Sequence, residues 1–213
     1  MRSEIYTIGH SIHTIDIFIG MLQSHEVTAV ADVRSTPYSR RNPQFNREAL
    51  RAALKSAAIQ YVFLGKELGA RSEDQSCYVD DKVQYALLAK TPLFQSGIGR
   101  VLEGVRSHSI ALMCAEKDPL DCHRTILVAR HLEQAGLKIM HILSDGGVEA
   151  HEAALARLVD RLKLRSEDMF RSQSISVEEA YEKQAKRIAY ERTADHNPGR
   201  VQRSTKQKAS EDI

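Results

Sequence analysis

The stretch from residue 109 to 132 constrains this chain more than any other segment. It begins with an apolar run over 110–113, which predicts a buried strand. It then turns polar at Asp118 and Pro119 and ends as a helix with apolar residues at helical spacing. Asp118 and Asp121 are both candidate N-caps, and Pro119 suits a first helical position. The stretch therefore predicts a strand, a turn and a helix, with two thiols, a carboxylate, an imidazole and a guanidinium gathered at their junction.

Units of the same kind recur along the chain. Apolar runs typical of strands cover residues 5–8, 27–34, 59–64, 110–113 and 137–143. Helical periodicity covers residues 15–22, 47–55, 83–88, 95–106 and 148–162. This alternation predicts an α/β fold, with a mainly parallel sheet of about five strands, helices on both faces and right-handed crossovers.

Local capping and turn signals refine the predicted elements. Asn46 is the expected cap of the helix over 47–55, and Gly136 is the expected C-terminal cap of the helix before the fifth strand. The polar residues 72–81 resist assignment and are expected to form an excursion over the sheet edge. A capping box over Ser176–Glu179 predicts a helix that ends at about Arg192.

The domain organisation follows from these elements. Residues 1–165 are expected to form one α/β domain, 166–192 a helical extension and 193–213 a disordered polar tail. The extension has only a partial apolar face. It is therefore expected to dock either on the domain or on a partner, and a homo-oligomer formed through residues 176–192 is one such arrangement.

Composition excludes several classes of protein. The formal net charge is only +2, so bulk charge favours neither a nucleic-acid nor a membrane partner. No run approaches the roughly 20 apolar residues of a membrane helix, and no signal peptide precedes the first strand. We therefore expect a cytoplasmic protein. In that compartment the 3 cysteines are better interpreted as thiols or ligands than as a disulfide framework.

The polar residues that could carry chemistry fall at the predicted strand ends. They are His10 after the first strand, Asp32 and Arg34 after the second, Cys114 and Glu116 after the fourth, and Cys122, His123 and Arg124 on the following helix. The ends of parallel strands share one edge of a sheet, so these side chains are predicted to surround a single cavity. His141 lies inside its strand and Cys77 lies in a polar loop, and neither is assigned to the site.

Roles follow from residue type. Acid–base or nucleophilic chemistry is assigned to His10, Asp32, Glu116, Cys122 and His123. Ligand or anion binding is assigned to Arg34, Arg124, Ser11 and Cys114. No residue is assigned to a metal, and the cofactor is left unknown. Structural interpretations stand beside these roles: Asp32 and Arg34 as an ion pair, Cys114 as a small buried hydrophobe, and His10 as a turn residue.

Several motifs resemble one family. They are Thr7-Ile-Gly-His-Ser11, Asp32-Val-Arg34 with Pro37-Tyr-Ser39, Tyr61 with Leu68-Gly69, Cys114-Ala-Glu116 with Cys122-His-Arg124, and His141-Ile142. Together they resemble the DUF488 family from about residue 4 to 145. The helix after Ser176, with Ala180-Tyr181, Gln184 and Ile188-Ala-Tyr190, is similar to an extension that many members carry. The family has no established activity, so the resemblance implies membership and pocket residues but no reaction.

Three functions remain open. The favoured one is binding of, or action on, a phosphorylated small molecule or nucleic acid, with Arg34 and Arg124 as the anion cradle. The second is thiol chemistry by Cys122 and Cys114, although the chain has neither the Cys-x-x-Cys nor the Cys-x5-Arg spacing of known motifs at this point. The third is a zinc or iron site on Cys114, Cys122, His123 and His10. It ranks last because no close Cys or His pair has a standard ligand spacing and because the two arginines would repel a cation. A ligand-sensing module without catalysis is the non-enzymatic alternative.

Overall fold

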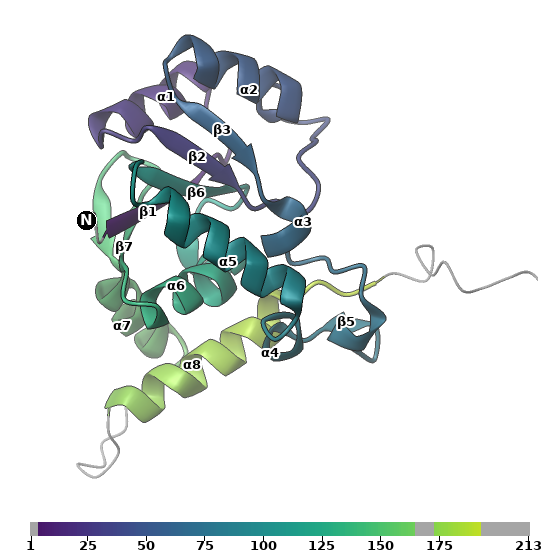
Figure 1. Cartoon of the computed structure of the whole chain (residues 1–213). Coiled ribbons are helices and arrows are strands. Elements are labelled where there is room, and N and C mark those ends of the chain that lie inside the picture. The colour runs from purple at the N-terminus through teal and green to yellow at the C-terminus, as the bar shows by residue number, and fades with distance from the viewer. Residues whose placement is uncertain (1–3, 165–172, 193–213) are drawn as a thin grey trace, which may run out of the picture.

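The sheet of the computed structural model has six strands, in the order β3-β2-β6-β1-β7-β8 (Figure 1). The structure describes residues 4–164 and 173–192, so the predicted tail over 193–213 lies outside it. The strands are β1 (Glu4–Gly9), β2 (Ala29–Asp32), β3 (Gln60–Phe63), β6 (Ile110–Cys114), β7 (Lys138–Ile142) and β8 (Val148–Ala150). The first five are parallel, as the sequence predicts, and β8 adds an antiparallel edge.

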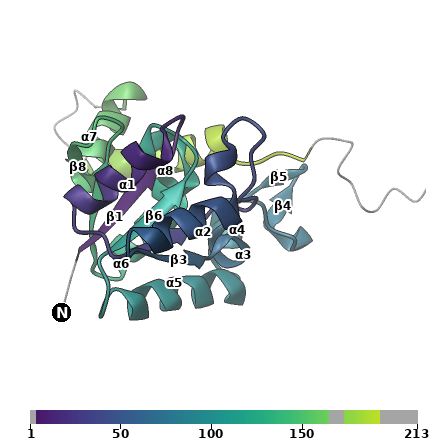
Figure 2. The ribbon, with the colours of Figure 1, turned by 90° about the horizontal axis from the view of Figure 1, so that it is seen from above.

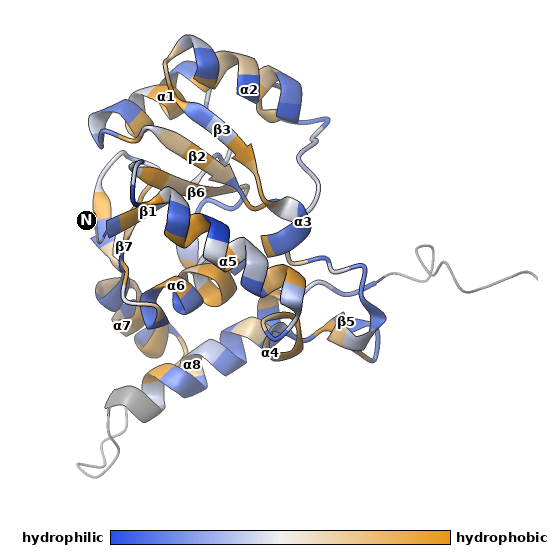
Figure 3. Cartoon of the chain, viewed as in Figure 1, coloured by the Kyte–Doolittle hydropathy of each residue, from blue (hydrophilic) through white to orange (hydrophobic). Residues whose placement is uncertain are grey.

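Each central strand buries both faces, which explains its nearly continuous apolar sequence. In β6, Ile110, Leu112 and Cys114 face one hydrophobic cluster, whereas Ala111 and Met113 face the other. In Figure 3, β2 and β6 are coloured as hydrophobic, while α2 (Arg47–Ser56) alternates between hydrophobic and hydrophilic residues. The sheet is therefore the middle layer of a three-layer domain.

Helices cover both faces, as predicted. One face carries α1 (Ile15–Ser24) and α2, whose residues Phe18 and Leu50 are fully buried. The other face carries α5 (Pro92–Gly104), α6 (Arg130–Gln134), α7 (His151–Arg161) and α8 (Gln173–Ile188). Figure 2 shows α5 across the sheet from α1 and α2. Among the described residues no helix is long and apolar enough to span a membrane.

The excursion predicted over 72–81 is a small hairpin, β4 (Tyr78–Val79) with β5 (Lys82–Val83), preceded by α3 (Gly65–Leu68) and followed by α4 (Tyr85–Leu88). Cys77 enters this hairpin through a 3-10 turn and is only 1% exposed. The sequence places Cys77 in a polar loop, but its side chain belongs to the main hydrophobic cluster. The thiol is thus a small core side chain.

Local signals at helix ends were only partly correct. Gly136 follows α6 with φ of 91°, the left-handed conformation expected of a helix C-terminal glycine. The capping box at Ser176 is wrong, because α8 already begins at Gln173. Asn46 occupies the N-cap position, but its side chain accepts a hydrogen bond from the Ser39 N–H instead. The helix predicted from residue 148 begins as strand β8, which pairs with β7 before α7 starts.

The opening stretch forms its helix in three short pieces. Asp118 caps a 3-10 turn over Pro119–Asp121, in which Pro119 is the first residue. A π-helical segment over Arg124–Ala129 follows and continues into α6. Such π-segments are rare and concentrate at functional sites. This one is buried over its whole length between the sheet and α8.

Candidate functional site

Cys114, Cys122 and His123 form a buried cluster where β6 ends and the helical segment begins. The Nδ1 atom of His123 lies 3.7 Å from Cys114 Sγ and 3.9 Å from Cys122 Sγ. All three potential ligand atoms lie within 4.8 Å of one another, and each residue is less than 9% exposed. The cluster places two soft sulfur donors and one imidazole nitrogen around a common point.

The orientation of the His123 ring is set by the second strand. Its Nε2 lies 2.9 Å from the carbonyl oxygen of Val33. A carbonyl only accepts, so Nε2 carries a proton and donates it. Nδ1, the nitrogen facing the two sulfurs, is then the unprotonated one in the neutral ring. This tautomer is the one that can bind a metal or accept a thiol proton.

The surroundings of Cys122 favour its thiolate form. Burial would raise the pKa of the Cys122 thiol, but a hydrogen bond from Cys114 and the charges of Arg124 and His123 outweigh it and hold the pKa well below its usual value. The N–H of Arg124 also points at Cys122 Sγ, at 3.4 Å. The helix after Cys122 begins as short non-α turns, so these groups lower the pKa of Cys122 without the dipole of a long α-helix.

Glu116 shares a proton with Cys122. The Sγ–Oε2 distance of 2.8 Å requires a hydrogen between the two atoms. Burial and the nearby Cys122 raise the pKa of Glu116. Because the pKa of Cys122 is lowered at the same time, the sulfur and the carboxyl group compete for this one proton. Burial also raises the pKa of Cys114 well above its usual value, so Cys114 is a neutral thiol in the absence of a cation.

Asp32 and Arg34 form an ion pair beside this cluster. Arg34 donates from Nε to Oδ1 at 2.9 Å and from Nη2 to Oδ2 at 2.7 Å, and both residues are at most 5% exposed. Nη2 also donates to the carbonyl of Phe45, and Tyr61 donates to Asp32 Oδ2. The Arg34 charge is thereby neutralised at the back of the site, although Arg34 still lines the pocket.

His10 is a neutral side chain that supports Arg34. Its ring stacks on Phe45 with centroids 4.4 Å apart, its Nδ1 donates to the carbonyl of Ser11, and its Nε2 accepts from Arg34 Nη1 at 3.3 Å. Burial, aided by Arg34, lowers the pKa of His10 to about 4. Ser11 has φ of 48°, and its N–H donates to the carbonyl of Ala115. His10 and Ser11 thus connect the end of β1 to the loop after β6.

Arg124 lies behind the cluster, not at its opening. It is 0% exposed and donates from Nη1 to the carbonyl of Glu116 at 2.8 Å. Its Nε and Nη2 have no hydrogen-bond partner among the described residues, and no carboxylate there pairs with it. A buried guanidinium needs a counter-charge, and the thiolate of Cys122 supplies one.

A cavity of about 250 Å³ opens beside the cluster. Its walls are Arg34, Ser35, Thr36, Ala70, Arg71, Tyr85, Cys114, Ala115, Glu116, Asp121, His123, Ile188 and Tyr190. Of the eight residues predicted to surround one cavity, Arg34, Cys114, Glu116 and His123 line it. His10, Asp32, Cys122 and Arg124 do not, although each contacts a residue that does. Ser11, predicted to bind the ligand, does not line the cavity either, and its N–H donates to the carbonyl of the wall residue Ala115. The predicted residues therefore lie together, some lining the cavity and the others behind them.

Sequence reasoning did not assign the other nine wall residues to the site, and Ala70, Arg71, Ile188 and Tyr190 are among them. Ile188 and Tyr190 come from the C-terminal extension, which was expected to dock on the domain or on a partner. The resemblance to the family had marked both residues, but no chemical pattern connected them to the cysteines. The extension therefore completes the pocket.

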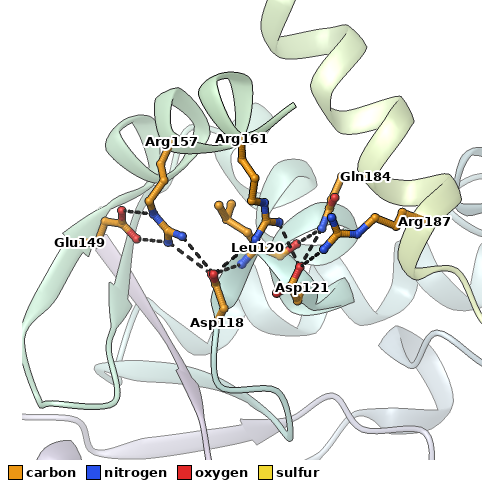
Figure 4. A network of polar contacts seen from close by, with 8 residues as sticks. All are labelled: Asp118, Leu120, Asp121, Glu149, Arg157, Arg161, Gln184 and Arg187. Carbon is orange, nitrogen blue, oxygen red and sulfur yellow. Dashed lines mark hydrogen bonds and ion pairs between the residues drawn. The ribbon is translucent and has the colours of Figure 1, made fainter. Parts of the chain in front are cut away.

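Charged residues clamp the extension onto the loop that carries the cluster (Figure 4). Asp121 accepts from Arg161, Gln184 and Arg187, and the buried Gln184 also donates to the carbonyl of Leu120 at 2.7 Å. Arg157 joins Asp118 to Glu149. The same loop thus holds Glu116 and Cys122 on one side and both C-terminal helices on the other.

His141 belongs to a second buried polar chain. Its Nδ1 bonds to Thr7 Oγ1 at 2.8 Å and its Nε2 to His151 Nδ1 at 2.9 Å, and His151 Nε2 bonds to the Tyr181 hydroxyl at 2.7 Å. This chain joins β1, β7, α7 and α8 and does not line the pocket. Leaving His141 out of the site agrees with that position.

A larger cavity, of about 760 Å³, lies between α8, α4 and the π-helical segment. Its floor includes Ile126 and Leu127, and its rim includes Lys82, Lys90 and Lys186. None of its lining residues belongs to the cysteine cluster, so the smaller cavity is the candidate site despite its size.

The fold and the cluster define an α/β protein with a thiol–imidazole centre at the carboxyl edge of a mostly parallel sheet. A family model described as a domain of unknown function, DUF488, matches residues 14–131, which is more than half of the chain. The chain belongs to the DUF488 family. The matched segment includes the cysteine cluster but neither His10 nor the C-terminal extension. No curated protein and no solved structure matches the chain.

Proposed function

We propose that this protein holds a divalent transition metal, with zinc the best fit, on Cys114, Cys122 and His123, and uses it to act on a ligand in the adjoining pocket. The observation that carries the proposal is the convergence of two sulfurs and one imidazole nitrogen. Tetrahedral zinc with bonds of about 2.3 Å to sulfur and about 2.0–2.1 Å to nitrogen separates its sulfur and nitrogen ligands by about 3.6 Å. The separations of 3.7 and 3.9 Å are close to that value.

The surroundings support a cation. His123 donates its distal N–H to a backbone carbonyl, an arrangement shared by most metal-bound histidines. Two thiolates would balance a divalent ion, and the Arg124 charge would balance the Glu116 carboxylate. The sequence alone ranks a metal last because its two arginines would repel a cation. In the structure Asp32 neutralises Arg34, which removes much of that objection.

Three protein ligands leave a fourth position, which is typical of catalytic zinc sites. Cys114, Glu116 and His123 all line the pocket, so a ligand there would lie next to the ion. A metal in this position would polarise a bound oxygen or activate a water, and Glu116, with its raised pKa, would supply or remove a proton.

The ligand we propose is a phosphorylated molecule, as the sequence favours. Supporting this choice, the pocket contains Arg34, Arg71 and the hydroxyls of Ser35 and Thr36. Arg124 does not line the pocket, so we no longer assign it to phosphate binding. We propose instead that its charge stabilises the thiolate of Cys122.

Elemental analysis of the purified protein tests the metal. We expect one zinc or iron per chain, and absorption bands from sulfur–cobalt bonds after replacement by cobalt. Cys114→Ser and Cys122→Ser should lose both signals, whereas Cys77→Ser, a matched change at another buried thiol, should keep them. A metal-free protein that forms no cobalt bands would reject the proposal. If thiol counting then shows Cys114 and Cys122 oxidised to a disulfide, the thiol-based alternative takes its place.

A further inference from the structure

One part of the pocket wall is built from two segments far apart in the sequence. Arg71 follows α3, and Tyr190 follows α8. The Arg71 guanidinium lies over the Tyr190 ring, with its central carbon 4.5 Å from the ring centroid. Both side chains line the cavity beside Cys114 and His123. The contact is a cation–π pair, which fixes the orientation of a long side chain.

Each member of this pair is fixed by its own backbone. The N–H of Arg71 donates to Ser35 Oγ at 3.0 Å. The carbonyl of Tyr190 accepts from the N–H of Val83 at 2.9 Å, and Arg192 N–H donates to the carbonyl of Asp81. The segment after α8 is therefore attached to the β4–β5 hairpin, and the Tyr190 ring is held in place over the pocket.

Arg71 is the cation of this wall whose charge is not balanced. Arg34 is neutralised by Asp32, and Asp121 is already paired with Arg161 and Arg187. Arg71 makes no ion pair with any residue that the structure describes, and its side chain is exposed. An arginine held on an aromatic ring keeps its N–H groups free for two parallel bonds to a phosphate.

We propose that Arg71, positioned by Tyr190, selects a small phosphorylated molecule as the ligand of this pocket. The inference rests on the proposed function, since the metal would face the same cavity. The volume of about 250 Å³ fits a phosphate on a small body and lies below the usual range of about 300–1,000 Å³ for larger ligands. A nucleic-acid strand would instead need an extended basic groove with stacked aromatic residues.

Calorimetric titration of the zinc-loaded full chain tests the inference. The probe is ribose 5-phosphate, and ribose is its uncharged match. We expect the phosphate to bind and ribose not to bind. Arg71→Ala should weaken binding about tenfold or more, the scale of losing a charged hydrogen-bonding partner. Arg51→Ala, an exposed arginine on α2, should leave the affinity unchanged.

Tyr190 acts through Arg71, so its variants separate positioning from folding. Tyr190→Phe keeps the ring and should retain the affinity, whereas Tyr190→Leu should weaken binding severalfold. Equal affinity of wild type and Arg71→Ala, or equal binding of ribose and ribose 5-phosphate, would overturn the inference. So would tighter binding of a single-stranded oligonucleotide that is insensitive to Arg71→Ala.

The zinc content of each variant distinguishes the two proposals. Full zinc in Arg71→Ala with unchanged phosphate affinity removes the role of Arg71 and leaves the metal standing. A wild-type chain that takes up no zinc but binds ribose 5-phosphate through Arg71 removes the metal and leaves the ligand class standing.

Discussion

Asp32 and Arg34 form a bidentate ion pair at the end of β2, with Nη2 2.7 Å from Oδ2 and Nε 2.9 Å from Oδ1. The pair is buried and holds Arg34 at the back of the pocket. His10 Nε2 accepts a hydrogen bond from Nη1 of Arg34. Sequence reasoning assigns Asp32 to catalysis and notes an ion pair as its alternative. The geometry favours the alternative, because both carboxylate oxygens are already engaged.

Asp32→Asn should therefore act mainly on stability. It leaves a buried guanidinium without its counter-charge, a change that costs about 3–5 kcal/mol. Tyr61→Phe removes only one hydrogen bond to the same carboxylate and should cost about 1 kcal/mol. Urea unfolding of both variants measures the difference. Equal stability of Asp32→Asn and wild type would show that Asp32 is not a structural partner of Arg34.

Gly9 is required where β1 approaches the loop after β6. A Cβ at this position would lie 1.9 Å from the carbonyl oxygen of Glu116, which is a backbone atom and accepts from Arg124. Gly9→Ala should thus displace the loop, lower the free energy of unfolding by about 3 kcal/mol and weaken metal binding. Gly20→Ala in α1 is the matched control. No atom lies within 4 Å of its added carbon, so it should stabilise the chain by about 0.5–1 kcal/mol.

The sheet could be predicted from the sequence because strand and helix periodicity are local. The run over 110–113 and the helices over 15–22 and 47–55 all appear close to their expected positions. Strand β8 was missed because three residues paired at a sheet edge have no periodicity of their own. The capping pattern at Ser176 predicted the wrong start for α8. The pattern is local in the sequence, but it does not set where α8 begins.

The candidate site could be predicted only in part. Polar residues at strand ends identified Cys114, Glu116 and His123 correctly as neighbours, since parallel strands share an edge. The metal was ranked last because no close Cys or His pair has a standard ligand spacing. Eight residues separate Cys114 from His123, and only the turn over 115–121 in the structure brings the two together. The contact between Arg71 and Tyr190 was not predicted, because no local pattern in either segment indicates it.

Buried histidines make the stability depend on pH. Burial lowers the pKa of His151 to about 4, while its unfolded value is about 6.5. Below pH 6.5 the unfolded chain takes up a proton that the folded chain refuses. The free energy of unfolding therefore falls as the pH drops from 6.5 toward 4, by about 1.4 kcal/mol per pH unit for each such group. Burial shifts His141 and His10 in the same direction.

His151→Gln should make this dependence shallower by about 1.4 kcal/mol per pH unit. The measurement is the urea midpoint between about pH 7 and pH 5, compared between the variant and wild type. The slope, not the absolute stability, is the readout, because the substitution also breaks the bonds to His141 and Tyr181. An unchanged slope would mean that His151 is protonated alike in the folded and unfolded chains.

Variants of Arg124 distinguish metal binding from ligand binding. It is 0% exposed, and its charge stabilises the Cys122 thiolate from behind. Arg124→Met should raise the pKa of Cys122 and weaken zinc binding about 10- to 100-fold, the usual cost of losing a supporting residue around a metal. Arg124→Lys keeps the charge and should retain most of the affinity. Competition with a chelator measures both values. Phosphate affinity should stay the same in the two variants, because Arg124 does not line the pocket. A selective loss of phosphate binding with full zinc affinity would instead restore Arg124 to the anion cradle that the sequence predicts.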